Sequence, residues 1–199
     1  MSKVRKIHSA RSAPGYPGSI RIIGGTWRRR RLVVPPAIEL RPTPDRVRET
    51  VFNWLQPWLP GAHCIDLFAG SGALCLEALS RGAASAVMVE TAPQVVEVLR
   101  ENVARLGAAN SSVVQADAEQ FLQGAVRKFD IVFLDPPFRS KLIASCARLL
   151  DERGWLSAHG LVYIESPSDM TALPIPASWE LIRSRTAGQV GYHLARKQA

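Results

Sequence analysis

The sequence predicts a doubly wound α/β fold: a Rossmann-like, mostly parallel sheet with an antiparallel C-terminal hairpin and a small N-terminal β-hairpin extension. Beyond residue 61, short apolar runs alternate with longer helical patterns, which is typical of βαβ units. The first apolar run leads into the small-residue segment 66–72, and α/β sheets place ligands at the carboxyl ends of such strands. Residues 179–186 and 189–196 leave no room between them for a crossover helix, which favours an antiparallel hairpin.

Three parts follow one another along the chain. Residues 1–19 mix Ser, Pro, Gly, Lys and Arg, so we expect a disordered basic tail there. Residues 20–42 contain two short β-prone runs, "IRIIGG" and "RRLVV", and should form the hairpin extension. Residues 43–199 should form the main domain. It opens with a helix, because Thr43 can cap it, Pro44 suits its first position and apolar residues then recur at helical spacing.

The remaining elements of the main domain follow from the alternation of apolar runs and helical patterns. Strands are expected near residues 63–67, 85–90, 112–115, 129–134 and 160–165. Helices are expected between them, near residues 72–81, 92–106, 117–124 and 140–152. This order predicts a sheet that is covered by helices on both faces.

Composition bounds the class of protein. With 199 residues, 47% of them hydrophobic, the chain can build one well-buried core but not a second full domain. No run approaches the roughly 18 apolar residues of a membrane span, and the basic start lacks the apolar stretch of a signal peptide. We therefore expect a cytoplasmic protein with no membrane partner. Cys64, Cys75 and Cys146 are widely spaced within apolar patterns, so we expect buried thiols rather than disulfides or a zinc site.

Positive charge is concentrated at the N-terminal end. Residues 1–48 contain 12 Lys or Arg against 2 acids, or +10, whereas the remaining residues contain 13 against 15, or −2, which together give the net charge of +8. Such a local excess indicates a polyanion partner. The alternative is a solvated, partly disordered tail.

The segment "DLFAGSGALCLEAL" indicates a cofactor site at the end of the first strand. Its small residues let the backbone approach a ligand closely, and the following helix presents its N-terminal amides there. A dinucleotide fingerprint would need a third Gly or Ala where this chain has Cys75. In addition, Asp66 would repel a pyrophosphate. It would attract a cationic ligand such as the amino-acid end of S-adenosylmethionine, which carries an ammonium and a sulfonium.

Two further acids follow strand ends. Glu90 ends the second strand, 24 residues after Asp66, and can accept both ribose hydroxyls. Asp117 follows the third strand and can accept the adenine amine, or it can simply cap the next helix. The candidate cofactor contacts are Asp66, Phe68, Ala69, Gly70, Ser71, Gly72, Glu90, Asp117 and Ala118.

The segment "FLDPPF", residues 133–138, is the candidate catalytic motif. Its two prolines stiffen the end of a predicted buried strand. The Asp135 side chain and the Pro136 carbonyl can accept the two hydrogens of an exocyclic base amine and aim its lone pair at a methyl donor. Pro137 adds rigidity, and Phe138 can stack on the base. A tight turn with a core Phe explains the prolines equally well but gives the acid no purpose.

Together, "DLFAGSG" and "LDPPF" resemble the class I S-adenosylmethionine-dependent amino-methyltransferases. More closely, "RIIGGTWRRRRL", "LRPTPDRVRETVFNWL", "GALCLEALSRGA" and "AGQVGYHL" resemble the RsmD family over about residues 20–196. The resemblance implies methylation of a guanine N2 of 16S rRNA, at guanine 966, on a small-subunit assembly intermediate. It also implies cofactor contacts at 66–72, Glu90 and Asp117, and catalysis by 135–138. Family members usually have a second polar or acidic residue soon after the position of Glu90, where this chain has Thr91 and Pro93.

The resemblance also implies that the basic hairpin contacts RNA. The candidate RNA-binding residues are Trp27, Arg28, Arg29, Arg30, Arg31, Arg46 and Arg48. Trp27 can stack on a base or anchor the hairpin to the domain. The alternatives to an rRNA enzyme are a DNA amino-methyltransferase and a non-catalytic RNA-binding assembly factor. We expect no metal, because a sulfonium leaving group needs no Lewis acid, and a monomer that acts on 16S rRNA or a small-subunit particle.

Overall fold

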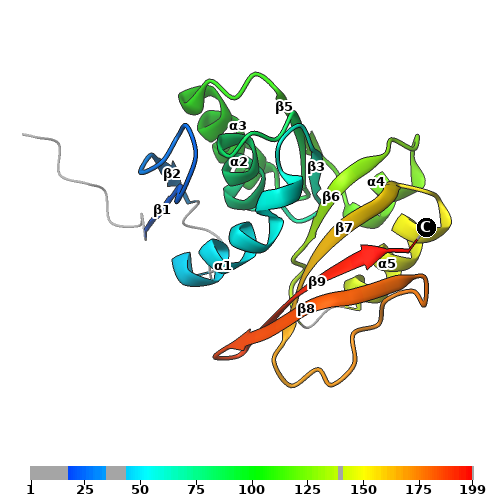
Figure 1. Cartoon of the computed structure of the whole chain (residues 1–199). Coiled ribbons are helices and arrows are strands. Elements are labelled where there is room, and N and C mark those ends of the chain that lie inside the picture. Colours follow the sequence, from blue (N-terminus) through cyan, green and yellow to red (C-terminus); the bar gives the residue numbers. More distant parts are fainter. Residues whose placement is uncertain (1–17, 35–43, 139–140, 199) are drawn as a thin grey trace, which may run out of the picture.

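A seven-stranded sheet forms the centre of the molecule. The computed structural model describes residues 18–34, 44–138 and 141–198 (Figure 1). The strands of the large sheet are β3 (His63–Asp66), β4 (Ser85–Glu90), β5 (Ser111–Gln115), β6 (Phe129–Leu134), β7 (Leu156–Pro167), β8 (Trp179–Ala187) and β9 (Val190–Lys197). The helices are α1 (Asp45–Leu55), the short 3-10 helix η1 (Gln56–Trp58), α2 (Ala73–Ser80), α3 (Pro93–Leu106), α4 (Ala118–Gln123) and α5 (Leu142–Glu152). A separate small sheet pairs β1 (Ser19–Arg21) with β2 (Arg31–Val33).

Strand order in the large sheet is β5-β4-β3-β6-β7-β9-β8. The five strands from β5 to β7 are parallel, and β9 and β8 run antiparallel at the edge. The chain winds outward from β3 to β5, returns to β6 and winds the other way. The order therefore reverses between β3 and β6, which is where doubly wound sheets bind ligands. The predicted fold class is confirmed.

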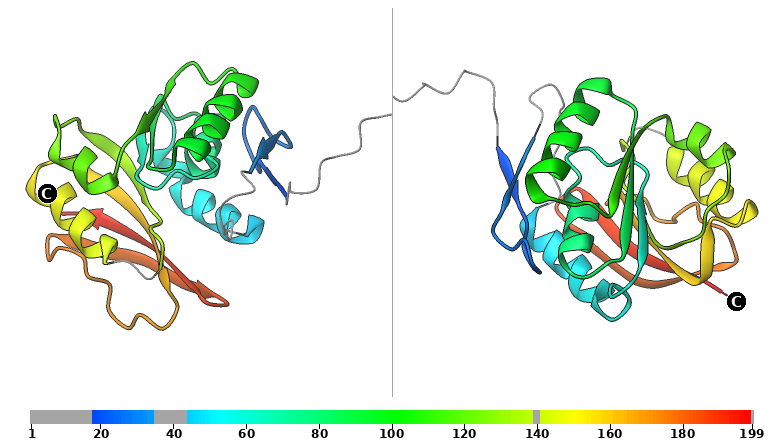
Figure 2. Two further views of the ribbon diagram at one scale, coloured as in Figure 1. Left: turned by 180° about the vertical axis from the view of Figure 1, so that it is seen from behind. Right: turned by 90° about the horizontal axis from the view of Figure 1, so that it is seen from above.

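Helices cover both faces of the sheet (Figure 2). Alternate strand residues face opposite sides, as the period of a strand requires. One face packs with α1, α2, α3 and the N-terminal hairpin, and its strand residues include Cys64, Met88, Ile131, Phe133 and Tyr163. The other face packs with α4 and α5, and its strand residues include Ile65, Val87, Val132, Leu134 and Ile164. No helix among the described residues is both long and apolar enough to cross a membrane.

Element boundaries differ from the prediction at two places. β7 begins at Leu156 rather than near residue 160. Its first part is irregular: the pairing with β6 shifts register there, and His159 adopts a φ of 61°. A β-bulge of this kind interrupts the alternation from which a strand is recognised. Pro44 is the residue before α1 rather than its first residue. The expected cap, Thr43, lies outside the described residues, as do most of the predicted tail 1–19 and part of the extension 20–42.

The N-terminal hairpin is held onto α2 by a buried carboxylate. Glu77 is fully buried and accepts hydrogen bonds from the backbone N–H groups of Ile23 at 2.6 Å and Gly24 at 2.8 Å. Gly25 has a φ of 74°, and a Cβ there would lie 1.7 Å from the Ser80 carbonyl oxygen, so only glycine permits this approach. The hairpin is therefore fixed to the domain by its turn.

A buried amide joins the other strand of the hairpin to α3. Asn102 is 1% exposed, accepts a hydrogen bond from the Val33 N–H at 2.8 Å and donates one to the Val33 carbonyl at 2.9 Å. Its side-chain N–H also donates to the Ser71 carbonyl at 3.2 Å. One side chain thus contacts both β2 and the glycine-rich loop.

Candidate active site

The acids predicted for the cofactor and the catalytic motif gather at the carboxyl ends of the parallel strands. Asp66, Glu90 and Asp135 each lie two residues beyond a strand residue that faces α1, α2 and α3. Alternation therefore directs all three toward that face. Asp66 pairs in register with Phe133, two residues before Asp135. The site thus spans the reversal of strand order between β3 and β6.

The loop after β3 is shaped by backbone hydrogen bonds. Asp66 is 2% exposed, and its carboxylate accepts a hydrogen bond from the Phe68 N–H at 3.0 Å. The Ala69 N–H donates to the Val89 carbonyl at 2.9 Å, which ties the loop to β4. Gly72 has a φ of 80°, and a Cβ there would lie 2.5 Å from Leu99 Cδ1. A side chain at this position would be strained by the positive φ and would have to displace Leu99.

Glu90 is held between two backbone amides. Its carboxylate accepts hydrogen bonds from the Gly70 N–H at 3.0 Å and the Ala92 N–H at 2.9 Å. A carboxylate has about four acceptor positions, so both oxygens keep capacity for ligand hydroxyls. Glu90 is therefore fixed at the loop and still able to bind.

Asp117 caps a helix. It is the N-cap of α4, and its side chain accepts a hydrogen bond from the Gln120 N–H at 3.0 Å. The helix-capping alternative for Asp117 is therefore confirmed. The cap uses the Oδ1 atom, and Ala118, which follows, is buried as the first residue of α4.

Burial gives Asp66 an unusual affinity for protons. Desolvation raises its pKa to about 7, the Phe68 N–H opposes this shift, and the negative charges of Glu90 and Glu165 add to it. A positively charged ligand in contact with this carboxyl would stabilise its ionised form. The acid is therefore suited to a cation and unsuited to a phosphate.

Glu165 is a site residue that sequence reasoning missed. It is 3% exposed, and the Tyr163 hydroxyl donates a hydrogen bond to its Oε1 atom at 2.6 Å. Since Leu134 pairs with Ile164, Asp135 lies level with Glu165 on the neighbouring strand. Burial raises the pKa of Asp135 well above its usual value, and the charges of Glu165 and then Asp66 raise it further. The available signal was position alone: Glu165 is the last residue of the predicted strand 160–165, although β7 continues to Pro167.

These buried acids do not form a metal site in the part of the chain that the structure describes. There, no three His, Cys, Asp or Glu side chains are arranged to hold an ion. The three cysteines are buried and carry free thiols.

The candidate catalytic motif, residues 133–138, begins buried and ends exposed. Asp135 is half-buried and Pro136 is buried, whereas Phe138 is 41% exposed. The alternative of a core Phe is therefore wrong in this structure. The exposed ring of Phe138, separated from Asp135 by two prolines, can stack on a planar group.

The candidate RNA-binding residues separate into surface and buried groups. Arg28–Arg31 are exposed, although Arg30 donates to the Arg105 carbonyl and Arg31 donates to Ser19 Oγ at 2.7 Å. Trp27 is half-buried against the core, which fits the anchoring alternative. Arg46 is exposed.

Arg48 does not lie on the surface as expected for an RNA contact. It is 1% exposed and donates to the Arg21 carbonyl at 2.9 Å and to Asp45 at 2.6 Å. Asp45 in turn pairs with the Arg21 guanidinium at 2.9 Å. The guanidinium of Arg48 therefore joins α1 to the N-terminal hairpin, and the helical spacing from Arg46 turns it inward.

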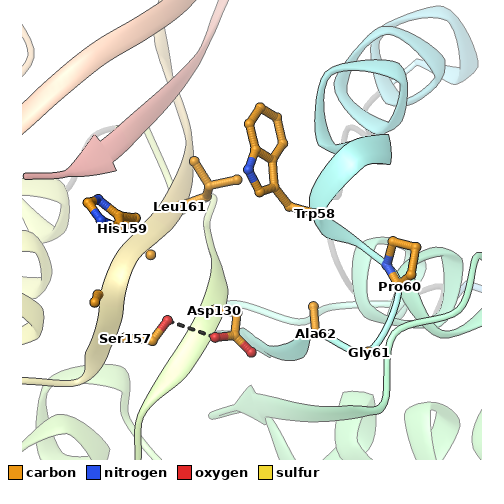
Figure 3. Close-up of a pocket in the computed structure, with 10 residues that line it drawn as sticks. Trp58, Pro60, Gly61, Ala62, Asp130, Ser157, His159 and Leu161 are labelled. Carbon is orange, nitrogen blue, oxygen red and sulfur yellow. Dashed lines mark hydrogen bonds between the residues drawn. The ribbon is translucent and has the colours of Figure 1, made fainter.

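A cavity of about 250 Å³ lies at the opposite end of the sheet (Figure 3). It is lined by Trp58 and by residues near the starts of β3, β6 and β7, where Ser157 donates a hydrogen bond to Asp130 at 2.7 Å. The predicted acids lie at the carboxyl ends of the same strands. This cavity is therefore separate from the candidate active site.

Comparison with known proteins places these features in one family. The family model described as Conserved hypothetical protein 95 matches residues 20–196. Ribosomal RNA small subunit methyltransferase D of Escherichia coli (strain K12) is 50% identical over 188 residues, which cover 94% of this chain and 95% of that protein. The protein of the same name from Haemophilus influenzae is 40% identical and covers 91% of this chain and 95% of its own length. The solved structure of yhhF from Escherichia coli matches with a TM-score of 0.84 and 50% identity, covering 92% of this chain and 99% of that one.

Proposed function

The chain belongs to the family described as Conserved hypothetical protein 95, the RsmD family, and from this premise we propose that it methylates the exocyclic N2 amine of a guanine in 16S rRNA. That it is an rRNA methyltransferase follows from relatives of that name at 40% and 50% identity over most of the chain. The guanine, its N2 atom and S-adenosylmethionine as the methyl donor are the proposal. We further propose that it acts as a cytoplasmic monomer on a small-subunit assembly intermediate.

The residues at the strand ends fit S-adenosylmethionine. Asp66, whose pKa burial raises to about 7, would gain most from a cationic ligand. Glu90 would accept the ribose hydroxyls while the Gly70 N–H holds it in place, and Asp117 would accept the adenine amine. When bound, the cofactor supplies a methyl group on a positively charged sulfur.

One observation supports the assignment of the catalytic motif: the desolvated carboxyl of Asp135 directly follows β6, close to Asp66, and the exposed ring of Phe138 comes three residues later. In the proposed reaction the Asp135 carboxylate and the Pro136 carbonyl accept the two hydrogens of the guanine amine. This favours a tetrahedral nitrogen, whose lone pair would form the new N–C bond while the S–C bond to the methyl group breaks and its electron pair stays on the sulfur. The methylated nitrogen then gives up one proton, and Asp135 can take it because its pKa is raised. Phe138 would hold the base by stacking.

A methyl-incorporation assay tests this function. The purified protein is incubated with labelled S-adenosylmethionine and, in parallel, naked 16S rRNA, small-subunit particles and duplex DNA. We expect label in the particles, recovered as N2-methylguanosine after nuclease digestion and mass spectrometry. Label in the duplex DNA alone would establish the DNA amino-methyltransferase instead. No transfer, together with no heat of cofactor binding in calorimetry, would establish a non-catalytic assembly factor.

A further inference from the structure

A second cavity lies between α1 and the β8–β9 hairpin, at the same end of the sheet as the catalytic motif. It has a volume of about 420 Å³. Its lining residues are Arg46, Val47, Thr50, Arg185, Thr186, Ala187, Gly188 and Tyr192. Two of these side chains, Arg46 and Arg185, are cationic, and none is acidic. The cavity therefore presents two positive charges to solvent without a carboxylate in its wall.

Both walls direct polar groups into this space. Arg46 and Thr50 are four residues apart on α1 and so share one helical face. Trp54, four residues further on, stacks on Tyr192 with ring centroids 5.4 Å apart, and Tyr192 lines the cavity. On the other wall Arg185 pairs in register with Tyr192 across β8 and β9. The two arginines thus belong to facing elements that an aromatic stack holds together.

Neither Arg46 nor Arg185 forms an ion pair within the described structure. Arg46 and Arg185 are exposed, and no described carboxylate lies within ion-pair distance of either guanidinium. The nearby Asp45 is engaged by Arg21 and Arg48. Unpaired guanidinium groups in a cavity are suited to phosphate, which they can bind with two parallel hydrogen bonds.

Strand register places this cavity beside the reacting groups. Tyr192 pairs with Glu165 on β7, and Glu165 lies level with Asp135 on β6. Two strand spacings, or about 10 Å, therefore separate Asp135 from the wall of the cavity. A nucleotide whose base reaches Asp135 has its own backbone at a comparable distance from that base.

We propose that Arg46 and Arg185 form a binding site for the RNA backbone, which holds a phosphodiester next to the nucleotide being methylated. This inference rests on the proposed function, and it assigns a substrate-binding role to the C-terminal hairpin. Phosphate contacts fix the position of a nucleic acid, whereas base contacts select its sequence. The site would therefore position the guanine without choosing it, and the N-terminal hairpin would bind RNA elsewhere.

The test compares Arg46→Ala, Arg185→Ala and the double variant with native protein in steady-state methylation of small-subunit particles. For each single variant we expect the KM for the particle to rise about tenfold, as the loss of a charge-assisted hydrogen bond implies. RNA binding should also lose about 0.7 of its logarithmic salt slope per lost contact. The Kd for S-adenosylmethionine should stay within twofold. Arg185→Lys should restore the salt slope, because it restores the charge.

Arg148→Ala is the matched control, since it removes an exposed arginine from α5, where the native side chain pairs with Glu152 at 2.8 Å. It should leave the KM and the salt slope unchanged. A double variant with native KM and native slope overturns the proposed phosphate site. If native protein methylates none of the RNA substrates, the proposed function fails instead, and the salt slope of RNA binding still tests the two arginines.

Discussion

The binding of S-adenosylmethionine should weaken as the pH falls from 8 to 6, because Asp66 must be ionised to hold a cation. Its pKa in the ligand-free protein is about 7. If only the ionised form binds, the ratio of the two Kd values is (1 + 10)/(1 + 0.1), or about 10, which corresponds to about 1.4 kcal/mol. Calorimetry at several pH values, with full-length protein, measures this change directly. A native Kd that is equal at pH 6 and pH 8 refutes the reasoning.

Two variants separate Asp66 from the titration of the ligand itself. Asp66→Asn should bind weakly and lose the protein's part of the pH dependence, so that the remaining dependence belongs to the ligand. Glu165→Gln should move the transition to lower pH, because one of the negative charges that raise the pKa of Asp66 is gone. A transition that stays in place in Glu165→Gln would show that the two carboxyls do not interact.

The same shift predicts how the ligand-free protein responds to pH. The pKa of Asp66 rises from the usual 3.8 of an aspartate to about 7 in the folded protein, so between these values the folded state binds more protons than the unfolded state. Stability therefore falls as the pH rises through this window. Asp66→Asn, which keeps an acceptor for the Phe68 N–H, should raise the Tm of the ligand-free protein at pH 8. An equal or lower Tm would contradict the assignment.

Three further variants test the catalytic acid, the basic hairpin and its attachment. Asp135→Ala should abolish methyl transfer while S-adenosylmethionine still binds, and turnover near the native rate would refute the role of this acid. Replacing Arg28–Arg31 with Gln should weaken RNA binding and reduce its salt slope by about 0.7 per lost phosphate contact; an unchanged slope would assign these arginines to a solvated surface. Glu77→Gln should lower the free energy of unfolding by about 2 kcal/mol, because one of two partly buried backbone amides loses its charged acceptor and the ion pair with Arg81 is lost. Denaturant titration measures this loss, and the exposed Glu97→Gln on α3 is the control that should show none.

Much of the fold follows from local signals in the sequence. The alternation of β-prone and helical runs depends on side-chain periodicity within a few residues, and it located the strands of the large sheet. Acids at strand ends were also recognisable, because the carboxyl ends of parallel strands meet at one edge whatever the loops do. Asp66 and Asp135 lie on neighbouring strands for this reason.

What the sequence did not reveal depends on contacts between distant segments. Glu77 lies in an apolar helical run, and its backbone partners are 53 and 54 residues earlier in the chain. Arg48 resembles any other arginine of a basic stretch, yet its position on α1 turns it toward the hairpin. Arg46 and Arg185 line the same cavity although they are 139 positions apart in the sequence (185 minus 46). No local pattern encodes such a meeting.

The side chain of Asn102 connects the N-terminal hairpin, the proposed RNA contact, with the loop after β3, the proposed cofactor site. It holds β2 with two hydrogen bonds and the Ser71 carbonyl with a third. If RNA displaced the hairpin and Asn102 with it, the Ser71 carbonyl of the loop would lose its hydrogen bond from the Asn102 side chain. If a ligand changed the conformation of the loop and moved Asn102, the hydrogen bonds between Asn102 and Val33 of the hairpin would weaken. Linkage of this kind acts equally in both directions. If RNA binds the hairpin and the methyl donor binds the loop, as proposed, the two binding events share one free-energy term.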